Sequence, residues 1–561
     1  MNILVCVKPA LAGADSAMVT REKAALEISR QDLLAYSCAL WLRRQAGGSV
    51  TLLAMSSANA VECLEPLYAY GADRIVLLSN PLLAGSDTVA TSYALASWIR
   101  NEGHYELILS GCQSSDSETG QVPASLAESL GMPCYANVVE ISLGQQGCFL
   151  LKRELERYFV KTEASVPALL TIKNWAESER PKLAQILENH KKVELQQVLP
   201  CDASMVGTVG SQTRVCRLRD RKENSFKFMA EDGAGRTVCV YLENACGHLL
   251  AFSDELITVA RELKKRYGFT ISGLALCSGN ALKNLLREVQ QLSFERIDIY
   301  IGDAFEYFED GNYLEGICEY YDSHRPDLIL APNTVHSKTV LSQLASRKRL
   351  GMCADCVEIC QHGEQIVATR PVYEGNTYAD ICATGSTLVC TIRKNIFDPH
   401  PRNSDVAANI CIHPCEAAGI NSERLLSVSN RHFAGTESNQ IMIGVGAGLR
   451  RKEDLDQIRQ MADLIHADIG VTRALVEKGW APKEYQIGLS GRAVQPELYI
   501  ALGISGASQH LIGLRKCKNI IAVNRDANAT VFQYATVGIV ADFYDVLPRL
   551  SQMILNRRKD G

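Results

Sequence analysis

The sequence predicts an α/β protein in which helices cover parallel sheets. Short apolar runs alternate with helix-like segments in residues 1–200, and the same alternation returns in residues 237–393. This pattern is typical of a parallel sheet with helices on both faces. A last group of apolar runs lies in residues 485–543. Each of these runs is followed by small or polar residues, which predicts a further buried parallel sheet.

The first block, residues 1–200, contains most of its predicted elements in regular order. The strands are Ile3–Val7, Val50–Met55, Ile75–Leu78, Leu107–Ser110 and Ala168–Ile172, and the clearest helices are Leu33–Arg44 and Thr88–Ile99. Residues 201–236 are charged, contain glycine and are poor in apolar periodicity. Their later part is therefore interpreted as a linker.

The second block, residues 237–438, is predicted to be a domain followed by a connecting segment. Its strands are Thr237–Leu242, Ile271–Leu276, Ile297–Ile301, Leu328–Leu330 and Thr387–Ile392. Residues 394–438 are rich in Asn, His, Pro and Ser, which favours loops. The last domain, residues 439–561, begins with the strand Ile441–Val445 and continues with Tyr499–Ile504, Ile520–Val523 and Gly538–Val540.

The two blocks resemble each other in detail. In the first, Glu106–Gly111 leads to Leu126–Met132 and then to Val138–Ile141. In the second, Asp327–Pro332 leads to Leu344–Met352 and then to Cys356–Ile359 at nearly the same spacing. The sequence therefore predicts an internal duplication of a whole domain, not an array of short repeats.

Composition excludes several classes of protein. The chain has 561 residues, 47% hydrophobic and 22% charged, with a net charge of −5, so it carries no basic footprint for nucleic acid. No apolar run reaches the roughly 18 residues that a membrane span requires. The start, MNILVCVKPA, lacks the features of a signal peptide and is predicted to be the first strand. These observations predict a cytoplasmic protein whose 20 cysteines are reduced thiols.

One cysteine cluster is a candidate metal or redox site. Cys353 and Cys356 form a CxxC, with Cys360 and His362 close behind, and Cys411 and Cys415 form a weaker pair. No second CxxC completes a ligand set. The duplication aligns this cluster with Gly-Met-Pro-Cys134, at a connection after a helix, which favours a structural role and no metal.

Two glycine-containing turns are candidate ligand sites. Gly503-Ile504-Ser505-Gly506 precedes a helix predicted to begin at Ala507. Glycine lets the backbone approach a ligand, and a helix start offers unpaired N–H groups, which together can hold a pyrophosphate. An ordinary strand–turn–helix crossover is the alternative. The turn Gly444–Gly448 is GxGxG, not GxGxxG, and is a weak nicotinamide fingerprint.

Longer motifs carry a family resemblance. GLSGRAVQPELYIALGISGASQHLIG followed by IIAVNRD resembles the FAD-binding signature of the electron transfer flavoprotein alpha subunit. Leu350–Asp355, Thr369–Pro371 and Thr391–Arg393 resemble other parts of the alpha subunit. The first block resembles the beta subunit at Val5–Lys8, Gly71–Arg74, Ala84–Ser92 and Gly111–Val122. Gly207–Val215 resembles the beta subunit's C-terminal arm, which in the family wraps onto the alpha subunit. The resemblance implies a beta–alpha fusion. Its parts are a nucleotide-binding domain III (1–200), an arm and linker (201–236), domain I (237–438) and an FAD-binding domain II (439–561).

The resemblance also implies the FAD site. Arg473, preceded by Thr472, lies beside the isoalloxazine ring, where a cation favours negative charge on the reduced flavin. Ser490 bonds flavin N5, and His510 lies near the C2 carbonyl. Ser505, Gly506 and Gln509 are implied to lie at the pyrophosphate and ribityl chain, and Asn524 and Asp542 at the adenosine end. The other implied FAD residues are Gln486, Ile487, Gly488, Leu489, Ala507, Ser508 and Phe543. The family's Gly-Arg-Gly reads Gly446-Ala447-Gly448 here, a loss of charge that bears on potential and not on FAD binding.

A second nucleotide is implied in the first block. Asp116, Thr119, Gln121 and Val122 lie in the family's phosphate loop. Some family members hold AMP there as a structural ligand, and others hold a second FAD that accepts hydride from NADH. Ala84–Ser92 resembles the second group, whereas Ser29-Arg30 and Met55–Ser57 depart from the usual motifs, so both alternatives stay open.

The leading hypothesis is an electron carrier without covalent catalysis. It passes electrons one at a time through FAD to or from an acyl-CoA dehydrogenase-type flavoprotein. Residues 394–438 are a candidate hinge for the FAD domain. Asn174–Lys192 resembles the family's recognition loop, with Leu183 near the anchoring leucine. The alternative is an NADH-oxidising, electron-bifurcating flavoprotein with two FADs that also uses ferredoxin or flavodoxin. A nicotinamide-dependent dehydrogenase and a scaffold that has lost its flavin are less favoured.

Overall fold

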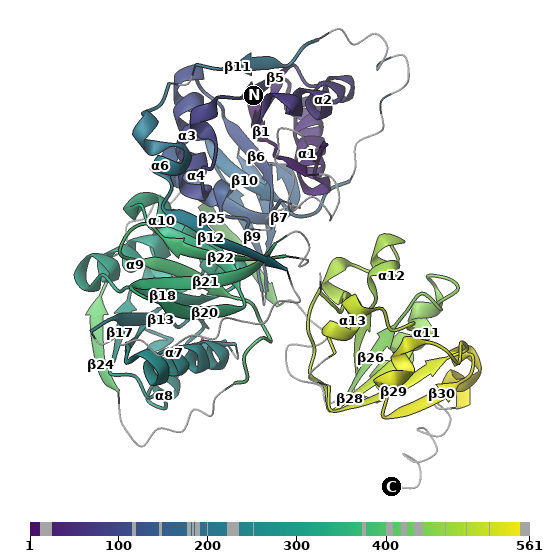
Figure 1. The fold of residues 1–561 in the computed structure, drawn as a ribbon. Helices are drawn as coiled ribbons and strands as arrows, with labels where there is room; N and C mark the ends of the chain where they lie inside the picture. The colour runs from purple at the N-terminus through teal and green to yellow at the C-terminus, as the bar shows by residue number, and fades with distance from the viewer. Residues whose placement is uncertain are drawn as a thin grey trace. The chain divides into compact units, whose positions relative to one another are not determined.

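The computed structural model divides the chain into two compact units, residues 1–431 and 432–561 (Figure 1). The structure describes residues 1–11, 25–114, 119–144, 148–156, 158–176, 181, 185, 191–198, 200–220, 235–250, 252–372, 377–399, 408–416, 423–430, 441–465, 467–489, 491–514 and 517–549. Each unit is an α/β body with its own sheets and cores, which confirms the predicted fold class.

The first half of the larger unit is built on a ten-stranded sheet of order β11-β5-β4-β1-β6-β10-β7-β8-β9-β25. Its strands are β1 (Asn2–Cys6), β4 (Ser49–Met55), β5 (Arg74–Leu78), β6 (Leu107–Gly111), β7 (Cys134–Leu143), β8 (Phe149–Glu154), β9 (Tyr158–Ala164), β10 (Ala168–Ile172) and β11 (Glu194–Gln196), with a small hairpin of β2 (Pro9–Leu11) and β3 (Leu26–Ile28). The helices are α1 (Arg30–Ala46), α2 (Val61–Leu64), α3 (Thr88–Glu102), α4 (Val122–Leu130) and α6 (Gly207–Gly210). The predicted strands and helices all exist, within a few residues of their expected ends.

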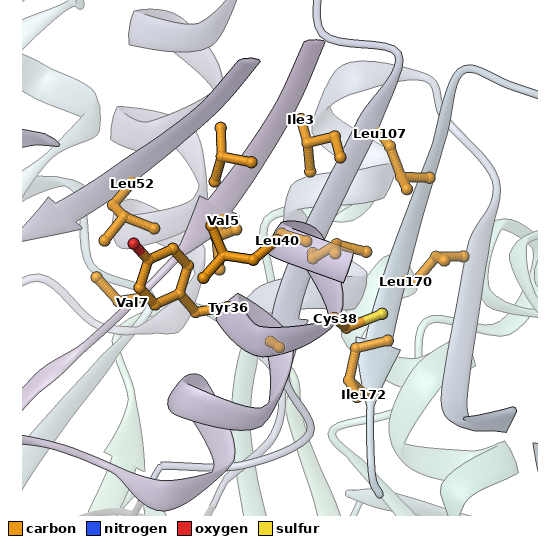
Figure 2. Close-up of a cluster of buried hydrophobic side chains, with 14 of the residues drawn as sticks. Ile3, Val5, Val7, Tyr36, Cys38, Leu40, Leu52, Leu107, Leu170 and Ile172 are labelled. Atoms are coloured by element: carbon orange, nitrogen blue, oxygen red, sulfur yellow. The ribbon is translucent and has the colours of Figure 1, made fainter. Parts of the chain in front are cut away.

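Alternation along β1 covers both faces of this sheet. Ile3 and Val5 face α1, where they pack with Tyr36, Cys38 and Leu40 (Figure 2). Leu4 faces the opposite side and packs in the core that contains Trp98 of α3. Helix α1 begins where Ser29 Oγ accepts the N–H of Asp32, and α3 begins where the Asp87 carboxylate accepts the N–H of Ala90.

The second half repeats the arrangement with a seven-stranded sheet of order β19-β23-β18-β13-β16-β17-β24, in which all neighbours are parallel. Its strands are β13 (Thr237–Tyr241), β16 (Thr270–Cys277), β17 (Arg296–Ile301), β18 (Leu328–Pro332), β19 (Gly351–Cys356), β23 (Leu388–Ile392) and β24 (Asn409–Pro414). Helices α7 (Ser253–Tyr267), α8 (Leu282–Val289), α9 (Asp310–His324) and α10 (Val335–Lys348) accompany it, with the short pair β14 (Asn244–Ala245) and β15 (His248–Leu249).

Two strands cross between the halves. β12 (Thr213–Asp220) joins β22 (Thr377–Ala383), β21 (Gln365–Val372) and β20 (Glu358–His362) in an antiparallel sheet. In return, β25 (Glu423–Asn430) pairs antiparallel with β9 of the first half. The expectation that residues 394–438 are dominated by loops is therefore wrong for β24 and β25. The Asn, His, Pro and Ser residues of this segment concealed them, and both are edge strands, which tolerate such residues.

The smaller unit is one parallel five-stranded sheet of order β27-β26-β28-β29-β30. The strands are β26 (Ile441–Val445), β27 (Asp468–Val471), β28 (Leu498–Leu502), β29 (Asn519–Asn524) and β30 (Val537–Val540), and the helices are α11 (Asp454–Leu464), α12 (Arg473–Glu477) and α13 (Ser508–Ile512). All three strands that residues 485–543 predict are present, and the strand at 441–445 matches to the residue.

Candidate functional site

The turn between β28 and α13 is the centre of the candidate site in the smaller unit. Gly503 and Gly506 have φ of +60° and +89°, a region that favours glycine. A Cβ at Gly506 would also collide with the backbone of Val531. Only glycine at this position lets the chain pass so close to its neighbour and then turn into the helix.

This turn presents a row of unused backbone donors. Within the described residues, nothing accepts a hydrogen bond from the N–H groups of Ser505, Gly506, Ala507, Ser508 or Gln509. Consecutive free N–H groups at the carboxyl end of a parallel strand form a cradle for an anion, and a pyrophosphate is the anion that this arrangement commonly holds. The geometry fits the predicted pyrophosphate position.

The GxGxG turn after β26 supports the cradle by packing. A Cβ at Gly446 would collide with the carbonyl of Gly503, so the two turns touch backbone to backbone. The N–H of Gly448 donates to the Gly503 carbonyl at 3.1 Å. Close packing explains these glycines without a nicotinamide nucleotide.

His510 lies buried on α13 with both ring nitrogens engaged. Nδ1 lies 3.0 Å from the Ile487 carbonyl, which only accepts, so Nδ1 carries the proton. Nε2 lies 3.1 Å from the Tyr499 hydroxyl and accepts from it. Burial lowers the pKa of His510 to about 4, so the imidazole is neutral at pH 7. In this arrangement His510 holds the segment Ile487–Leu489 in place through the Ile487 carbonyl.

Backbone hydrogen bonds connect the chain on both sides of α12 to the same edge of the sheet. The N–H of Ile487 donates to the Val471 carbonyl at 2.9 Å, and that of Leu489 donates to the Gln509 carbonyl at 2.7 Å. Thr472 Oγ1 is buried and has no hydrogen-bond partner among the described residues. An orphaned buried hydroxyl and a row of free N–H groups at the same edge of one parallel sheet indicate that a polar ligand belongs there.

Arg473 is solvent-exposed and pairs with Glu477 one turn along α12, with Nε 2.7 Å from the carboxylate. The side chain at the predicted isoalloxazine position is therefore held by an exposed ion pair, which is weak and can exchange partners.

The predicted adenosine end is assembled from β29 and the chain after β30. Asn524 donates through Nδ2 to the Ile504 carbonyl at 2.8 Å and so holds the turn. Asp542 pairs with Arg450, whose guanidinium lies 4.6 Å from the Tyr544 ring centroid. Phe543 is buried and packs on Gly503, so it shapes the turn from behind.

The structure thus brings nearly all predicted FAD residues to one edge of one sheet. Gln486, Ile487, Gly488, Gly506, His510 and Phe543 are buried; Thr472, Leu489, Asn524 and Asp542 are half-buried; Arg473, Ser505, Ala507, Ser508 and Gln509 are exposed. Ser490 lies outside the described residues.

A second candidate site lies at the carboxyl ends of β4 and β6 in the first half. Ser56 Oγ, Ser110 Oγ and Gln121 Nε2 are buried there without a hydrogen-bond partner among the described residues. Gln121 accepts from Thr88 Oγ1 at 2.7 Å, and Lys8 Nζ lies 3.4 Å from Ser114 Oγ. Three orphaned buried donors at the ligand-binding edge of a parallel sheet fit a polar ligand.

The sequence predicted part of this second site. Gln121 and Val122 lie at the start of α4 and Thr119 just before it, whereas Asp116 lies outside the described residues. The sequence marked Ser56 only as part of Met55–Ser57, which departs from the usual motif, and did not indicate Ser110 as a site residue. Their signal was a small polar residue at the end of an apolar run, which also occurs in ordinary turns.

The cysteine cluster lies on strands. Cys353 and Cys356 belong to β19, and the aligned Cys134 belongs to β7, so these cysteines do not lie in a connection as expected. The hydrogen bond with Cys356, together with burial, raises the pKa of Cys353 well above the usual value, and burial raises the pKa of Cys356 in the same way. Metal binding and thiol redox chemistry require a thiolate, which this environment disfavours. No metal-ligand cluster of three or more His, Cys, Asp or Glu occurs among the described residues.

Two further observations complete the survey. Leu183, in the predicted recognition loop, lies outside the described residues. None of the helices in the part of the chain that the structure describes combines the length and apolarity that crossing a membrane requires.

Comparison with known families agrees with this geometry. The Electron transfer flavoprotein domain matches twice, over residues 17–198 and 238–414, and the Electron transfer flavoprotein FAD-binding domain matches residues 436–515. The double match confirms the predicted duplication. The chain belongs to the electron transfer flavoprotein family, whose members work with redox partner enzymes.

Similar proteins align with a little over half of the chain. The LctC subunit of a lactate dehydrogenase (NAD(+),ferredoxin) from Acetobacterium woodii is 30% identical, covering 59% of this chain and 80% of that protein. An electron transfer flavoprotein subunit alpha from Clostridium acetobutylicum is 28% identical, covering 56% and 95%. A probable mitochondrial alpha subunit from Cryptococcus neoformans is 32% identical, covering 56% and 91%.

Proposed function

We propose that this protein is a single-chain electron carrier that binds FAD in residues 439–561 and exchanges electrons one at a time with an acyl-CoA dehydrogenase-type flavoprotein. In this proposal the first half acts as a beta subunit and the rest as an alpha subunit, with the division at 1–200, 201–236, 237–438 and 439–561. The observation that carries it is the row of free N–H groups from Ser505 to Gln509 beside the orphaned hydroxyl of Thr472.

Each part of the site has a separate task. When bound, FAD would supply the capacity to accept and release single electrons. The Ser505–Gln509 backbone would hold its pyrophosphate, and Gly506 would allow the close approach. Thr472 and Arg473 would lie toward the ring system, where a cation favours added negative charge. Neutral His510 would hold the Ile487–Leu489 strand in place, and Asn524 would hold the turn.

A second candidate function is NADH oxidation with electron bifurcation through two FADs. Two observations favour it: the orphaned polar groups of Ser56, Ser110 and Gln121, and the similarity to LctC, whose name states NAD(+) and ferredoxin as reactants. A site that holds AMP would satisfy the same three side chains, so the identity of this nucleotide separates the two functions.

Nucleotide content tests both proposals. The purified chain is denatured, and released FAD and AMP are quantified per polypeptide. One FAD with one AMP supports the carrier; two FADs, with bleaching of the flavin by NADH, support bifurcation. A chain that holds no FAD, even after incubation with it, contradicts both.

A pair of glycine variants controls this experiment. Gly506→Val is expected to abolish FAD binding in the smaller unit, because the side chain collides with Val531 and strains a positive φ. Gly279→Ala faces open space and is expected to leave the nucleotide content unchanged. Retained FAD in Gly506→Val would place the flavin elsewhere.

A further inference from the structure

Two cysteines meet where the arm of the first half crosses onto the second half. Figure 1 shows β12 alongside β22, and their register pairs Arg214 with Cys382 and Arg217 with Asp380. The register shifts between Val215 and Arg217, so Cys216 occupies a bulge. Residues two apart on a strand share a face, which brings Cys216 to the same side of the sheet as Arg214 and Cys382.

The two sulfurs and the Arg214 side chain form one contact group. The Cys216 and Cys382 thiols each lie 3.9 Å from the same carbonyl oxygen, that of Arg214. The Cys382 side chain is also a hydrogen-bond partner of the Cys216 thiol. Arg214 Nε donates to Cys382 Sγ at 3.2 Å, and the Arg214 side chain also interacts with Cys216, so this cation lies beside both sulfurs.

The two cysteines differ in access to solvent. Cys216 is exposed, whereas Cys382 is fully buried and packs with Cys360 and Val367. An oxidant in solution therefore reaches Cys216 first, and Cys382 is the thiol placed to react with the oxidised sulfur. This division of access is what a reactive and a resolving cysteine require.

We propose that Cys216 and Cys382 are an oxidation site at which a low-molecular-weight disulfide, such as oxidised glutathione, closes a disulfide between the two halves of the larger unit. Cys216 thiolate attacks one glutathione sulfur and releases one glutathione thiol, which takes the Cys216 proton. Cys382 thiolate then attacks Cys216 Sγ and releases the second glutathione, which takes the Cys382 proton. Two protein thiols are oxidised and one glutathione disulfide is reduced to two thiols.

The surroundings set the order and pace of these steps. Partial burial of the sulfur and the neighbouring Cys382 thiol raise the pKa of Cys216 to about 11. Little Cys216 is thiolate at pH 7, so the first step is slow. In the second step Arg214 positions the attacking sulfur, because its Nε donates to Cys382 Sγ next to Cys216.

The disulfide would join β12 of the first half covalently to β22 of the second half. β12 is the strand by which the first half adds to the second half's sheet, and it already carries the buried ion pair of Arg219 with Asp380. A disulfide closing the long loop between residues 216 and 382 restricts the unfolded chain and stabilises this junction. Oxidised protein is thus expected to keep the arm docked under conditions that release it from reduced protein.

The test uses the full chain treated with oxidised glutathione and then mapped by mass spectrometry without reduction. We expect a peptide linking residues 216 and 382, and a thermal midpoint of the larger unit raised by about 5 °C and restored by dithiothreitol. Cys216→Ser abolishes both effects. Cys246→Ser, which removes another exposed cysteine, leaves both unchanged.

Two results overturn the proposal. One is a stable glutathione adduct on Cys216 that never yields the 216–382 link; the other is oxidation with no change at either cysteine. The variant Arg214→Gln tests whether Arg214 positions the Cys382 sulfur for the second step or merely lies close to it. It is expected to slow the second step roughly tenfold, so that the mixed disulfide accumulates before the link forms. An unchanged rate in Arg214→Gln removes the arginine from the mechanism.

Discussion

The two copies of the duplicated domain differ in the length of the loop that connects a central strand to the following helix. In the first copy β6 ends at Gly111 and α4 begins at Val122. In the second, β18 ends at Pro332 and α10 begins at Val335, so only Asn333 and Thr334 connect them. One copy therefore has a long loop at the edge where parallel sheets bind ligands, and the other has almost none.

The polar groups at the two edges are satisfied differently. In the first copy Ser56, Ser110 and Gln121 keep orphaned buried atoms among the described residues. In the second copy the Glu243 carboxylate accepts from Thr334 Oγ1 at 2.5 Å and from Ser337 Oγ at 2.7 Å. Asn333 Nδ2 donates to Asp355 at 2.8 Å. The difference shows that a carboxyl edge of parallel strands collects polar groups, which either the protein or a ligand must satisfy.

The largest expected effect comes from removing the internal acceptor of the second copy. Glu243→Ala leaves the hydroxyls of Thr334 and Ser337 buried without an acceptor, and we expect it to lower the stability of the larger unit by about 2–5 kcal/mol. Thermal unfolding measures this loss. The nucleotide content of the folded fraction should not change; loss of a nucleotide would mean that the second copy also binds one.

The pH dependence of the two copies is expected to have opposite signs. Burial raises the pKa of Asp32 in the first copy to about 6, although the N–H of Lys8 bonds to it. Folded protein then holds this proton more tightly than unfolded protein, so the contribution of Asp32 to stability is complete below about pH 4 and is lost as the pH rises through 6. In the second copy, despite burial, Arg393 holds the pKa of Asp355 below its usual range. Its contribution is present above about pH 4 and is lost as the pH falls.

Asp32→Asn tests the first of these signs. The variant is expected to lose the decline in stability between pH 4 and pH 6, which amounts to about 2–3 kcal/mol. Urea midpoints measured across this range report it, with Asp73→Asn, a half-exposed carboxylate of the same half, as the control. If stability still declines between pH 4 and pH 6 in Asp32→Asn, another titrating group causes the decline.

A substitution at the carboxyl edge of the first copy's sheet is expected to change the affinity for the nucleotide of the first half. Gln121→Leu removes a buried amide whose Nε2 has no partner among the described residues, so its fold should survive. We expect the nucleotide of the first half to bind about tenfold to a hundredfold more weakly, as the loss of one or two hydrogen bonds implies. Titration with AMP and with FAD measures this change. Unaltered affinity for both would remove Gln121 from the site.

The smallest effect is expected where the two copies meet. Ser129 of α4 and Ser346 of α10 share a hydrogen bond of 3.0 Å between their hydroxyls, and Ser346 also donates to the Ser125 carbonyl at 3.1 Å. Ser129→Ala is expected to lower stability by about 0.5–1.5 kcal/mol, and Ser346→Ala by slightly more. A double-mutant cycle gives the coupling between them. Zero coupling would show that helix packing alone joins the copies here.

Prediction from the sequence succeeded where local patterns and packing agreed. The runs at Ile3–Val7 and Ala168–Ile172 became strands because a fully apolar run can only be buried, and parallel strands are buried on both faces. The turn Gly503–Gly506 was found because glycine at a positive φ has a sequence signature. Two edge strands were not predicted: β24 and β25 lie in a segment rich in residues that favour loops, and partners far along the chain define them.

The sequence by itself determined the fold class, the duplication, the family and the position of the glycine turn between β28 and α13, because each depends on residues that are neighbours in the chain. Only the tertiary structure decided that the arm forms β12 against β22 and that β25 pairs in return with β9. It also decided that His510 is neutral with both nitrogens engaged. It also revealed that one copy's edge is filled by Glu243 while the other keeps orphaned donors. These features depend on hydrogen bonds and burial between residues far apart in sequence, which no local pattern records.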